Sequence, residues 1–281
     1  MEQRHPLNYF ITPLEIAGSC LGGLSNSLPV IFGIECCRNG TKELQMIFDA
    51  DYDHRLDSKG KDPDSHSPTL KLQHQLLWSK PLPNGSLLDL QSEPSKYLIH
   101  SSVSEVFHLS SDSISHSLRN QKRMRPLISK IPTSELDEFQ SAGSVIAARI
   151  LFPGNRIDNR FTINQARGTH PRINDRFDLT LECIRMHYLG LSNPLESVLN
   201  RYRDFFILFG DFKGYVDFFL LQDLVSADYT EVLYFIPHDP SFKSSPRPDS
   251  LESYMQYKAS TIRFIKARNS RIKDWAASNL S

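Results

Sequence analysis

The segment INQARGTHPRINDRFDLTLECIRMHY, residues 163–188, predicts a helix that helps to decide the fold class. Gly168 and Pro171 favour a loop in its first part, and Asn174 is a suitable N-cap. Apolar residues then recur at spacings of four, three and four, which is one face of a helix: Phe177, Leu181, Ile184 and Tyr188. We therefore expect a helix over residues 174–189.

The chain on the carboxyl side of this segment predicts mainly helices. Pro194 in a first turn and Gly210 as a stop signal favour a helix over 193–209. Ser250 is a suitable N-cap for a last helix over 250–275, whose outer surface is rich in Lys and Arg. The apolar run at 231–237 predicts one strand buried on both faces.

The first half of the chain predicts strands and loops. The turn at Asn39 and Gly40 favours a hairpin between strands at 28–35 and 42–49. Ser67 as a cap and Pro68 at a first helical position predict a short helix. Apolar stretches predict three more strands: 96–102, 106–112 and 143–154.

These patterns predict an α+β fold, with a single compact domain over residues 1–281. Its mixed sheet is expected to combine strands of both halves and to be covered by helices from the C-terminal half. An alternative is two subdomains that divide near residue 155.

Composition favours a soluble globular protein. The formal net charge is zero, with 40% hydrophobic and 23% charged residues, so no global attraction to nucleic acid or to an anionic membrane is expected. Apolar runs are too short to span a bilayer, and the amino terminus lacks a secretory signal pattern, so we expect a cytoplasmic protein. The four cysteines form no C-x-x-C pair, which favours reduced thiols over a zinc site. Common cofactor motifs are missing, so no metal and no cofactor is expected.

The charged side of residues 163–188 offers a candidate site. Asp178, Glu182 and Arg185 follow the helical rhythm as a stripe beside the apolar face. Basic and amide residues lie before or at the helix start, where backbone N–H groups favour anions: Asn164, Gln165, Arg167, Arg172 and Arg176. A phosphate or carboxylate site is one interpretation. The other is ordinary helix electrostatics, with Glu182 and Arg185 as an i, i+3 pair.

Several phrases of the sequence resemble an uncharacterised bacterial family known only as a domain of unknown function. The resemblance covers about residues 45–272 and leaves residues 1–35 outside. Its phrases are DPDSHSPTL, LWSKPLPNG, TINQARG, DRFDLTLECIR and GYVDFFLLQDLV. The resemblance implies a bacterial cytoplasmic protein and implies no mechanism.

The leading functional hypothesis is a hydrolase acting on nucleic acid or a nucleotide. Its most concrete form is a metal-independent DNA glycosylase, which hydrolyses an N-glycosidic bond, in defence against phage DNA. Asp178 or Glu182 would be the catalytic carboxylate, and the arginines, including Arg185, would hold phosphates with Asn164 and Gln165. Three aromatic residues would stack on an extruded base: Trp78, Tyr97 and Tyr188.

Three alternatives remain open. The first is a non-catalytic module that binds nucleic acid or protein. The second is an NAD-using enzyme similar to ADP-ribosyltransferases, with His100 and Ser110 on strands. The third is a metal-dependent nuclease built on the acidic segment 49–64, although His54 and Gly60 occupy positions where an EF-hand needs Gly and Glu. If the helical stripe is scaffold, His100, Asp112 and the acidic segment are the next candidates. Oligomeric state is left open.

Overall fold

A computed structural model describes residues 33–38, 41–46, 48–92, 97–101, 106–115 and 124–280, the first two ranges as backbone only. The chain divides into two units, Met1–Phe48 and Asp49–Ser281. In the first unit, β1 (Gly33–Arg38) and β2 (Thr41–Met46) pair antiparallel. This confirms the predicted hairpin, whose turn residues Asn39 and Gly40 lie outside the described residues.

The second unit contains a small sheet of order β3-β4-β5. Its strands are β3 (Leu98–Ser101), β4 (Val106–Ser113) and β5 (Arg149–Pro153), and both pairings are antiparallel. The α+β class is confirmed. The three strands form an antiparallel sheet rather than a mixed one, and no described residue after Pro153 adds a strand to it.

The prediction of a strand at 231–237 was wrong. Apart from one bridge between Val225 and Val232, this segment is irregular. Side chains at the start of the helix over residues 177–188 form hydrogen bonds with the backbone of this segment instead. Phe235 N donates to the Asp178 carboxylate at 2.9 Å, and the Ile236 carbonyl accepts from Arg176 at 3.1 Å. Val232, Phe235 and Ile236 are buried as expected, whereas Leu233 is exposed, and a helix supplies the hydrogen-bond partners.

Short helices surround the sheet in the first part of the unit. They are α2 (Arg55–Ser58), α3 (Pro63–His66), α4 (Pro68–Trp78), α5 (Arg125–Ile128), α6 (Thr133–Ala142) and the 3₁₀ turn η3 (Ile146–Ala148). The Ser67 hydroxyl accepts from Leu70 N at 3.1 Å, so Ser67 caps α4 as predicted.

The next elements are helical. They are α7 (Ile163–Thr169), α8 (Phe177–Tyr188), α9 (Glu196–Arg201), α10 (Arg203–Ile207), α11 (Phe212–Phe218) and the 3₁₀ turn η4 (Gln222–Leu224). Of these, α8 and the region of α9 and α10 are as predicted, α11 had no prediction, and α7 lies at residues where Gly168 and Pro171 predicted a loop. The expected helix over 193–209 is interrupted at Tyr202, whose hydroxyl donates to the Asn155 carbonyl at 2.6 Å. Asn174 is not a helix cap: Asn174 and Asp175 both have left-handed φ, and Arg176 is the N-cap residue.

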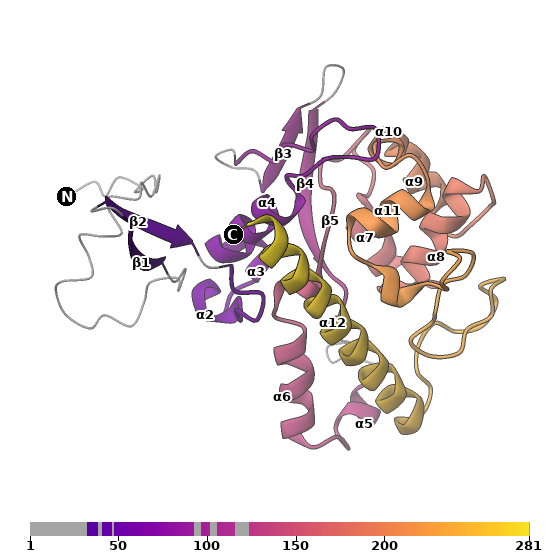
Figure 1. Cartoon of the computed structure of the whole chain (residues 1–281). Helices are drawn as coiled ribbons and strands as arrows, with labels where there is room; N and C mark the ends of the chain where they lie inside the picture. The colour runs from indigo at the N-terminus through magenta and orange to yellow at the C-terminus, as the bar shows by residue number, and fades with distance from the viewer. Residues whose placement is uncertain are drawn as a thin grey trace, which may run out of the picture. The chain divides into compact units, whose positions relative to one another are not determined.

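The last helix, α12 (Leu251–Asn279), begins with a capping box at Ser250 and Ser253, so the predicted cap is confirmed. It runs along α6, η3 and η4 (Figure 1). Arg268 of α12 is fully buried and donates to the carbonyls of Ala147, Arg149 and Phe219 at 2.7–3.1 Å. This basic residue, predicted for an exposed surface, ties α12 to the start of β5.

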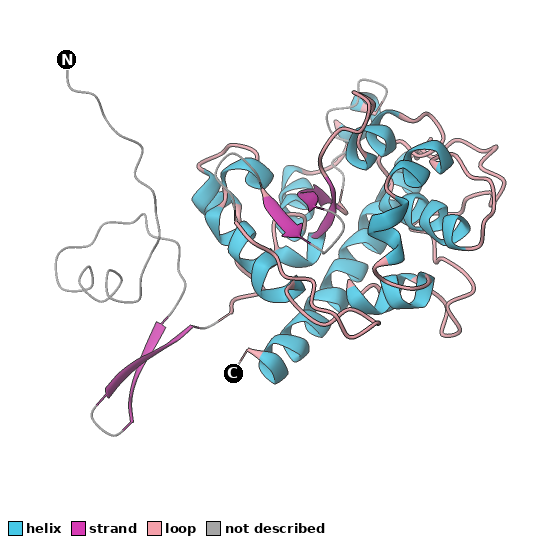
Figure 2. Cartoon of the chain, turned by 90° about the horizontal axis from the view of Figure 1, so that it is seen from above, coloured by secondary structure: helices cyan, strands magenta, loops and turns pink. Residues whose placement is uncertain are grey.

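Aromatic packing forms the core beside these helices. Rings in mutual contact include Trp78, Phe205, Phe206, Phe209, Tyr215, Phe218 and Phe219. Figure 2 shows helices around the short strands of this unit. Cys183 is a free, buried thiol, whereas Cys20 and the side chains of Cys36 and Cys37 lie outside the described residues. Among the described helices, none has the length and apolarity needed to cross a membrane.

Candidate functional site

Strand β4 carries polar residues on both faces. Ser113 lies opposite Arg149 on β5, and Asp112 lies opposite Ile150. Because side chains alternate along a strand, Ser111, Ser113 and Arg149 share one face, while Asp112 points to the other. Each face forms its own polar network.

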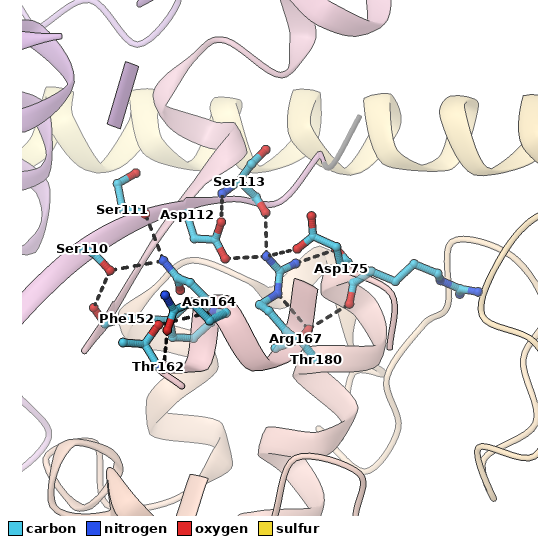
Figure 3. Close-up of polar contacts among 12 residues, drawn as sticks. Ser110, Ser111, Asp112, Ser113, Phe152, Thr162, Asn164, Arg167, Asp175 and Thr180 are labelled. Atoms are coloured by element: carbon cyan, nitrogen blue, oxygen red, sulfur yellow. Dashed lines mark hydrogen bonds and ion pairs between the residues drawn. The ribbon is translucent and has the colours of Figure 1, made fainter. Parts of the chain in front are cut away.

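The Asp112 face is organised by Arg167 of α7, which is fully buried. Its Nη1 contacts Asp112 Oδ2 at 2.5 Å and Asp175 Oδ1 at 2.8 Å, and its Nε donates to Thr180 Oγ1 at 3.1 Å. Figure 3 shows the guanidinium pointing between the two carboxylates. Burial opposes the charge of Arg167, but Asp175 and Asp112 raise its pKa. Arg167 therefore joins β4, α7 and α8 as an internal cross-link.

The two amides predicted to bind phosphate have internal partners as well. Asn164 Nδ2 donates to Ser110 Oγ and to the Ser111 carbonyl, both at 3.2 Å (Figure 3). Gln165 completes a capping box with Thr162 at the start of α7. Asn164 thus fixes α7 against β4, and Gln165 orders the first turn of α7.

The carboxylates of α8 are buried in ion pairs. Asp178 is fully buried and accepts two hydrogen bonds from Arg176, which is also fully buried. Glu182 accepts from Arg185 Nε at 2.8 Å and from Nη2 at 2.7 Å, as the i, i+3 alternative predicts. Arg176 also donates to the Pro246 carbonyl at 3.1 Å.

These placements favour the scaffold interpretation of the α8 stripe. The Arg167 and Arg176 side chains have no exposed surface. Removing Asp178 would leave Arg176 as a buried, unpaired cation, and ligand access to Arg167 or Arg176 would require the helices to separate. We therefore no longer assign Asp178 and Glu182 to catalysis, or Arg167 and Arg176 to anion binding. Arg172 differs, because it is exposed and lines a cavity of about 510 Å³ with residues 242–247.

Of the three predicted base-stacking residues, Trp78 belongs to the core and Tyr188 is half-buried with its hydroxyl bonded internally. Trp78 is fully buried against Phe219. Tyr188 packs on Phe206, and its hydroxyl donates to the Phe206 carbonyl at 2.7 Å. Tyr97 differs, because it lines a cavity of about 540 Å³ together with residues 64–68 and Lys71.

The other face of β4 holds the more accessible polar cluster. Arg149 Nη1 donates to Asp64 Oδ1 at 2.9 Å, and the Asp64 side chain is 23% exposed. Arg149 lines a cavity of about 580 Å³, and Asp64 lines the 540 Å³ cavity of Tyr97. The ion pair therefore links a residue of one cavity to a residue of the other.

The larger cavity has cationic, hydroxyl and apolar walls. Arg55, Lys61 and Arg149 supply cations, of which Arg55 is paired with Asp53 and Arg149 with Asp64, and Asp62 adds a carboxylate. Ser113, Ser115 and Ser144 supply hydroxyls, and Leu136 and Phe139 supply apolar surface. This combination suits an anionic ligand that also has an apolar part.

Burial shifts the proton affinities of this cluster. It raises the pKa of Asp64, although the Arg149 charge opposes the rise. It also raises the pKa of Tyr97 well above its usual range and lowers that of His74 well below. The Tyr97 hydroxyl lies 3.0 Å from His74 Nδ1. A partly exposed carboxyl with a raised pKa, in a cleft, is a typical acid–base group.

Two polar atoms of this cluster are buried and have no hydrogen-bond partner: His74 Nε2 and Arg149 Nε. Natural proteins pair most buried polar groups, so both atoms are open to a further partner.

The acidic segment 49–64 does not converge on one point. Its acids have separate partners: Asp51 contacts Lys273, Asp53 contacts Arg55, Asp57 accepts from Thr69 N, and Asp64 contacts Arg149. In the part of the chain that the structure describes, no three His, Cys, Asp or Glu side chains gather as metal ligands would. The segment thus offers a nuclease no shared metal site there.

The strand residues of the NAD-using alternative are also engaged. His100 is buried, lies stacked on Phe107, and its Nδ1 is 3.1 Å from the Asp89 carbonyl. Ser110 accepts from Asn164. Both residues lie on strands as expected, but their contacts are structural.

Sequence patterns include Asp64 only as the last acid of the segment 49–64, and they do not single out Arg149. One signal was present: Arg149 is a lone charge at the start of the apolar run ILFP. A charge in that position needs a buried partner, but the sequence does not identify it.

A family model matches residues 48–272, nearly the whole of the second unit. The chain belongs to this family, DUF6994, a family of unknown function. The match agrees with the resemblance to an uncharacterised family. It includes both faces of β4 and the three cavities, so these are features of the DUF6994 region. Comparisons with curated proteins and with solved structures found no match.

Proposed function

We propose that the chain is a hydrolase acting on a nucleotide or on DNA, most concretely a glycosylase that cleaves an N-glycosidic bond without a metal ion. The catalytic carboxyl in this proposal is Asp64, in place of Asp178 or Glu182. The observation that carries it is the Asp64–Arg149 pair: Asp64, a carboxyl of raised pKa, lines the 540 Å³ cavity, and its partner Arg149 lines the 580 Å³ cavity.

The chemistry requires one acid–base group. Protonated Asp64 would donate its proton to the leaving base as the bond between C1′ and nitrogen breaks. The resulting carboxylate would stabilise the positive sugar and then accept a proton from the water whose oxygen bonds to C1′. Water is consumed, and the base and a sugar hydroxyl are formed. Arg149 would act as a positioning residue that holds the Asp64 carboxyl.

The walls support an anionic substrate. Arg55 and Lys61 lie where phosphates of a nucleotide would be attracted, and Lys61 is exposed. Apolar surface from Leu136 and Phe139 would contact a base or sugar. A bacterial, cytoplasmic role in defence against phage DNA belongs to the same proposal.

The test is an incubation of purified protein with modified and unmodified DNA, with EDTA present, followed by alkaline cleavage at abasic sites. We expect Asp64→Asn to lower the rate of base release by on the order of a hundredfold or more. Asp223→Asn is the matched control, because Asp223 forms an exposed pair with Arg271 away from the cavities. Lys61→Gln is a second variant, expected to raise KM while the melting temperature stays unchanged.

An unchanged rate for folded Asp64→Asn would overturn the assignment of Asp64. DNA binding by the wild type without base release would instead favour the non-catalytic module. A parallel incubation without EDTA completes the test: base release that occurs only without EDTA would point to metal-assisted chemistry.

A further inference from the structure

A third cavity lies between the turn that joins α7 to α8 and the loop that leads into α12. It has a volume of about 510 Å³ and is lined by Pro171, Arg172 and residues 242–247. Its charged lining residues are all basic: Arg172, Lys243 and Arg247. Ser244 and Ser245 add hydroxyl groups. A surface of this composition attracts anions.

The acids near this cavity are committed elsewhere. Asp175 contacts Arg167, and Asp249 accepts from Ser253. Asp239 accepts from Ser241 N and Oγ, although its charge also interacts with that of Lys243. Within the described residues, no ion pair closer than 4.0 Å neutralises any of the three cations. The charges of Arg172 and Arg247 are therefore available to a ligand, and that of Lys243 is compensated only in part by Asp239.

Buried residues hold the cavity in shape. Arg247 Nε donates to Asn174 Oδ1 at 3.0 Å, which fixes the guanidinium by one edge. Arg176, beneath the loop, donates to the Pro246 carbonyl at 3.1 Å. An arginine held through Nε keeps its Nη groups for a second partner.

Two further polar groups lack partners at this place. Asn174 is 4% exposed, and its Nδ2 is buried without a hydrogen-bond partner. His238 Nδ1 lies 3.2 Å from Ser244 Oγ, and its Nε2 is also buried without a partner. Neither residue is among those that line the cavity, but Asn174 Nδ2 is a buried donor next to Arg247, and a buried donor without a partner is typical of a site that a ligand completes.

We propose that Arg172, Lys243 and Arg247 form a binding site for a phosphate group, separate from the Asp64 cavity. Arginine forks match phosphate oxygens in geometry, and serine hydroxyls donate to the remaining oxygens. In this proposal the phosphate belongs to a nucleotide or to a nucleic-acid backbone. This choice of source rests on the proposed function. The phosphate site itself does not depend on catalysis at Asp64.

The experiment measures binding of inorganic phosphate, a deoxynucleoside 5′-monophosphate and a single-stranded oligonucleotide by calorimetry at low and moderate salt. The test variant is Arg172→Gln/Lys243→Gln, because both side chains are exposed and their removal leaves no buried group unpaired. The control is Arg263→Gln, an exposed arginine of α12 outside the cavity lining. Melting temperatures of all variants are compared with that of the wild type.

We expect saturable binding by the wild type that weakens with salt, at least tenfold weaker binding by the double variant, and no change in the control. Equal binding by wild type and double variant, or no binding of any probe, would overturn the site. Tighter binding of the oligonucleotide than of phosphate supports a backbone source, whereas binding of inorganic phosphate alone would overturn that source. Base release is measured separately, so phosphate binding without base release counts against the glycosylase and leaves this site standing.

Discussion

Arg149 on β5 donates to the Asp64 carboxylate at 2.9 Å, although 85 residues separate the two along the chain. Burial raises the pKa of Asp64, and the Arg149 charge opposes that rise. The balance between these two effects sets how much of the acid form exists near neutral pH.

Replacing Arg149 by Gln should therefore raise the pKa of Asp64 further, because the opposing charge is gone. A carboxyl ¹³C NMR titration of both proteins measures this directly. If Asp64 acts as the acid, the alkaline limb of the pH–rate profile should move in the same direction. An Asp64 pKa that stays unchanged or falls in the variant would show that the Arg149 charge does not lower the pKa of Asp64.

Replacing Asp178 by Asn should lower the free energy of unfolding by about 3–5 kcal/mol, because Arg176 is left as a buried, unpaired cation. Urea unfolding measures the loss. The double variant Arg176→Met/Asp178→Leu should recover part of it. A variant as stable as the wild type, but inactive, would restore the catalytic interpretation of Asp178.

Acid should destabilise the fold through His74. Burial lowers its pKa well below 6.5, so below that pH the native state binds fewer protons than the unfolded chain. The free energy of unfolding then falls with falling pH, by at most about 1.4 kcal/mol per pH unit for this histidine. His54 has the same sign, while Asp64 and Asp112, with raised pKa values, have the opposite one.

Urea unfolding of wild type and His74→Asn at pH 7.5, 6.5 and 5.5 isolates the contribution of His74. The variant should show a smaller loss of stability between pH 6.5 and 5.5. Parallel pH dependence in the two proteins would mean that His74 is protonated in the folded state.

Lys80 should react unusually fast with acylating reagents at neutral pH. Its Nζ lies 4.7–5.1 Å from the ring centres of Phe218, Trp78 and Trp275, and burial together with Arg268 lowers its pKa to about 7. Competitive acetylation followed by mass spectrometry gives the rates of individual lysines. Lys273, paired with Asp51 at the surface, is the internal comparison, and an equal or slower rate at Lys80 would contradict the prediction.

Local patterns in the sequence predicted local structure. Ser67 before Pro68 located the start of α4, Ser250 located that of α12, and the spacing of Phe177, Leu181 and Ile184 located the buried face of α8. Each signal lies within a few residues of the structure it determines.

Such local patterns do not predict contacts between residues that are distant in the sequence. Asp178 and Glu182 share one stripe whether they face a cleft or the interior, and the sequence does not show that residues 235–246 cover Arg176 and Asp178. Arg268 is a second example. Its place in a basic helix predicts solvent exposure, but it is buried and donates to carbonyls about 50 and 120 residues away.

The two-sided polarity of β4 also limits how the sheet can assemble. Backbone hydrogen bonds alone would accept β4 shifted by one residue along β5, and such a shift turns every side chain to the opposite face. Asp112 would then point toward the Asp64 face, and Arg167 would meet serines in place of a carboxylate. A misaligned strand thus gathers like charges on one side and leaves Arg167 with one carboxylate, Asp175, in place of two on the other. Charge therefore selects a single alignment from several that the backbone permits.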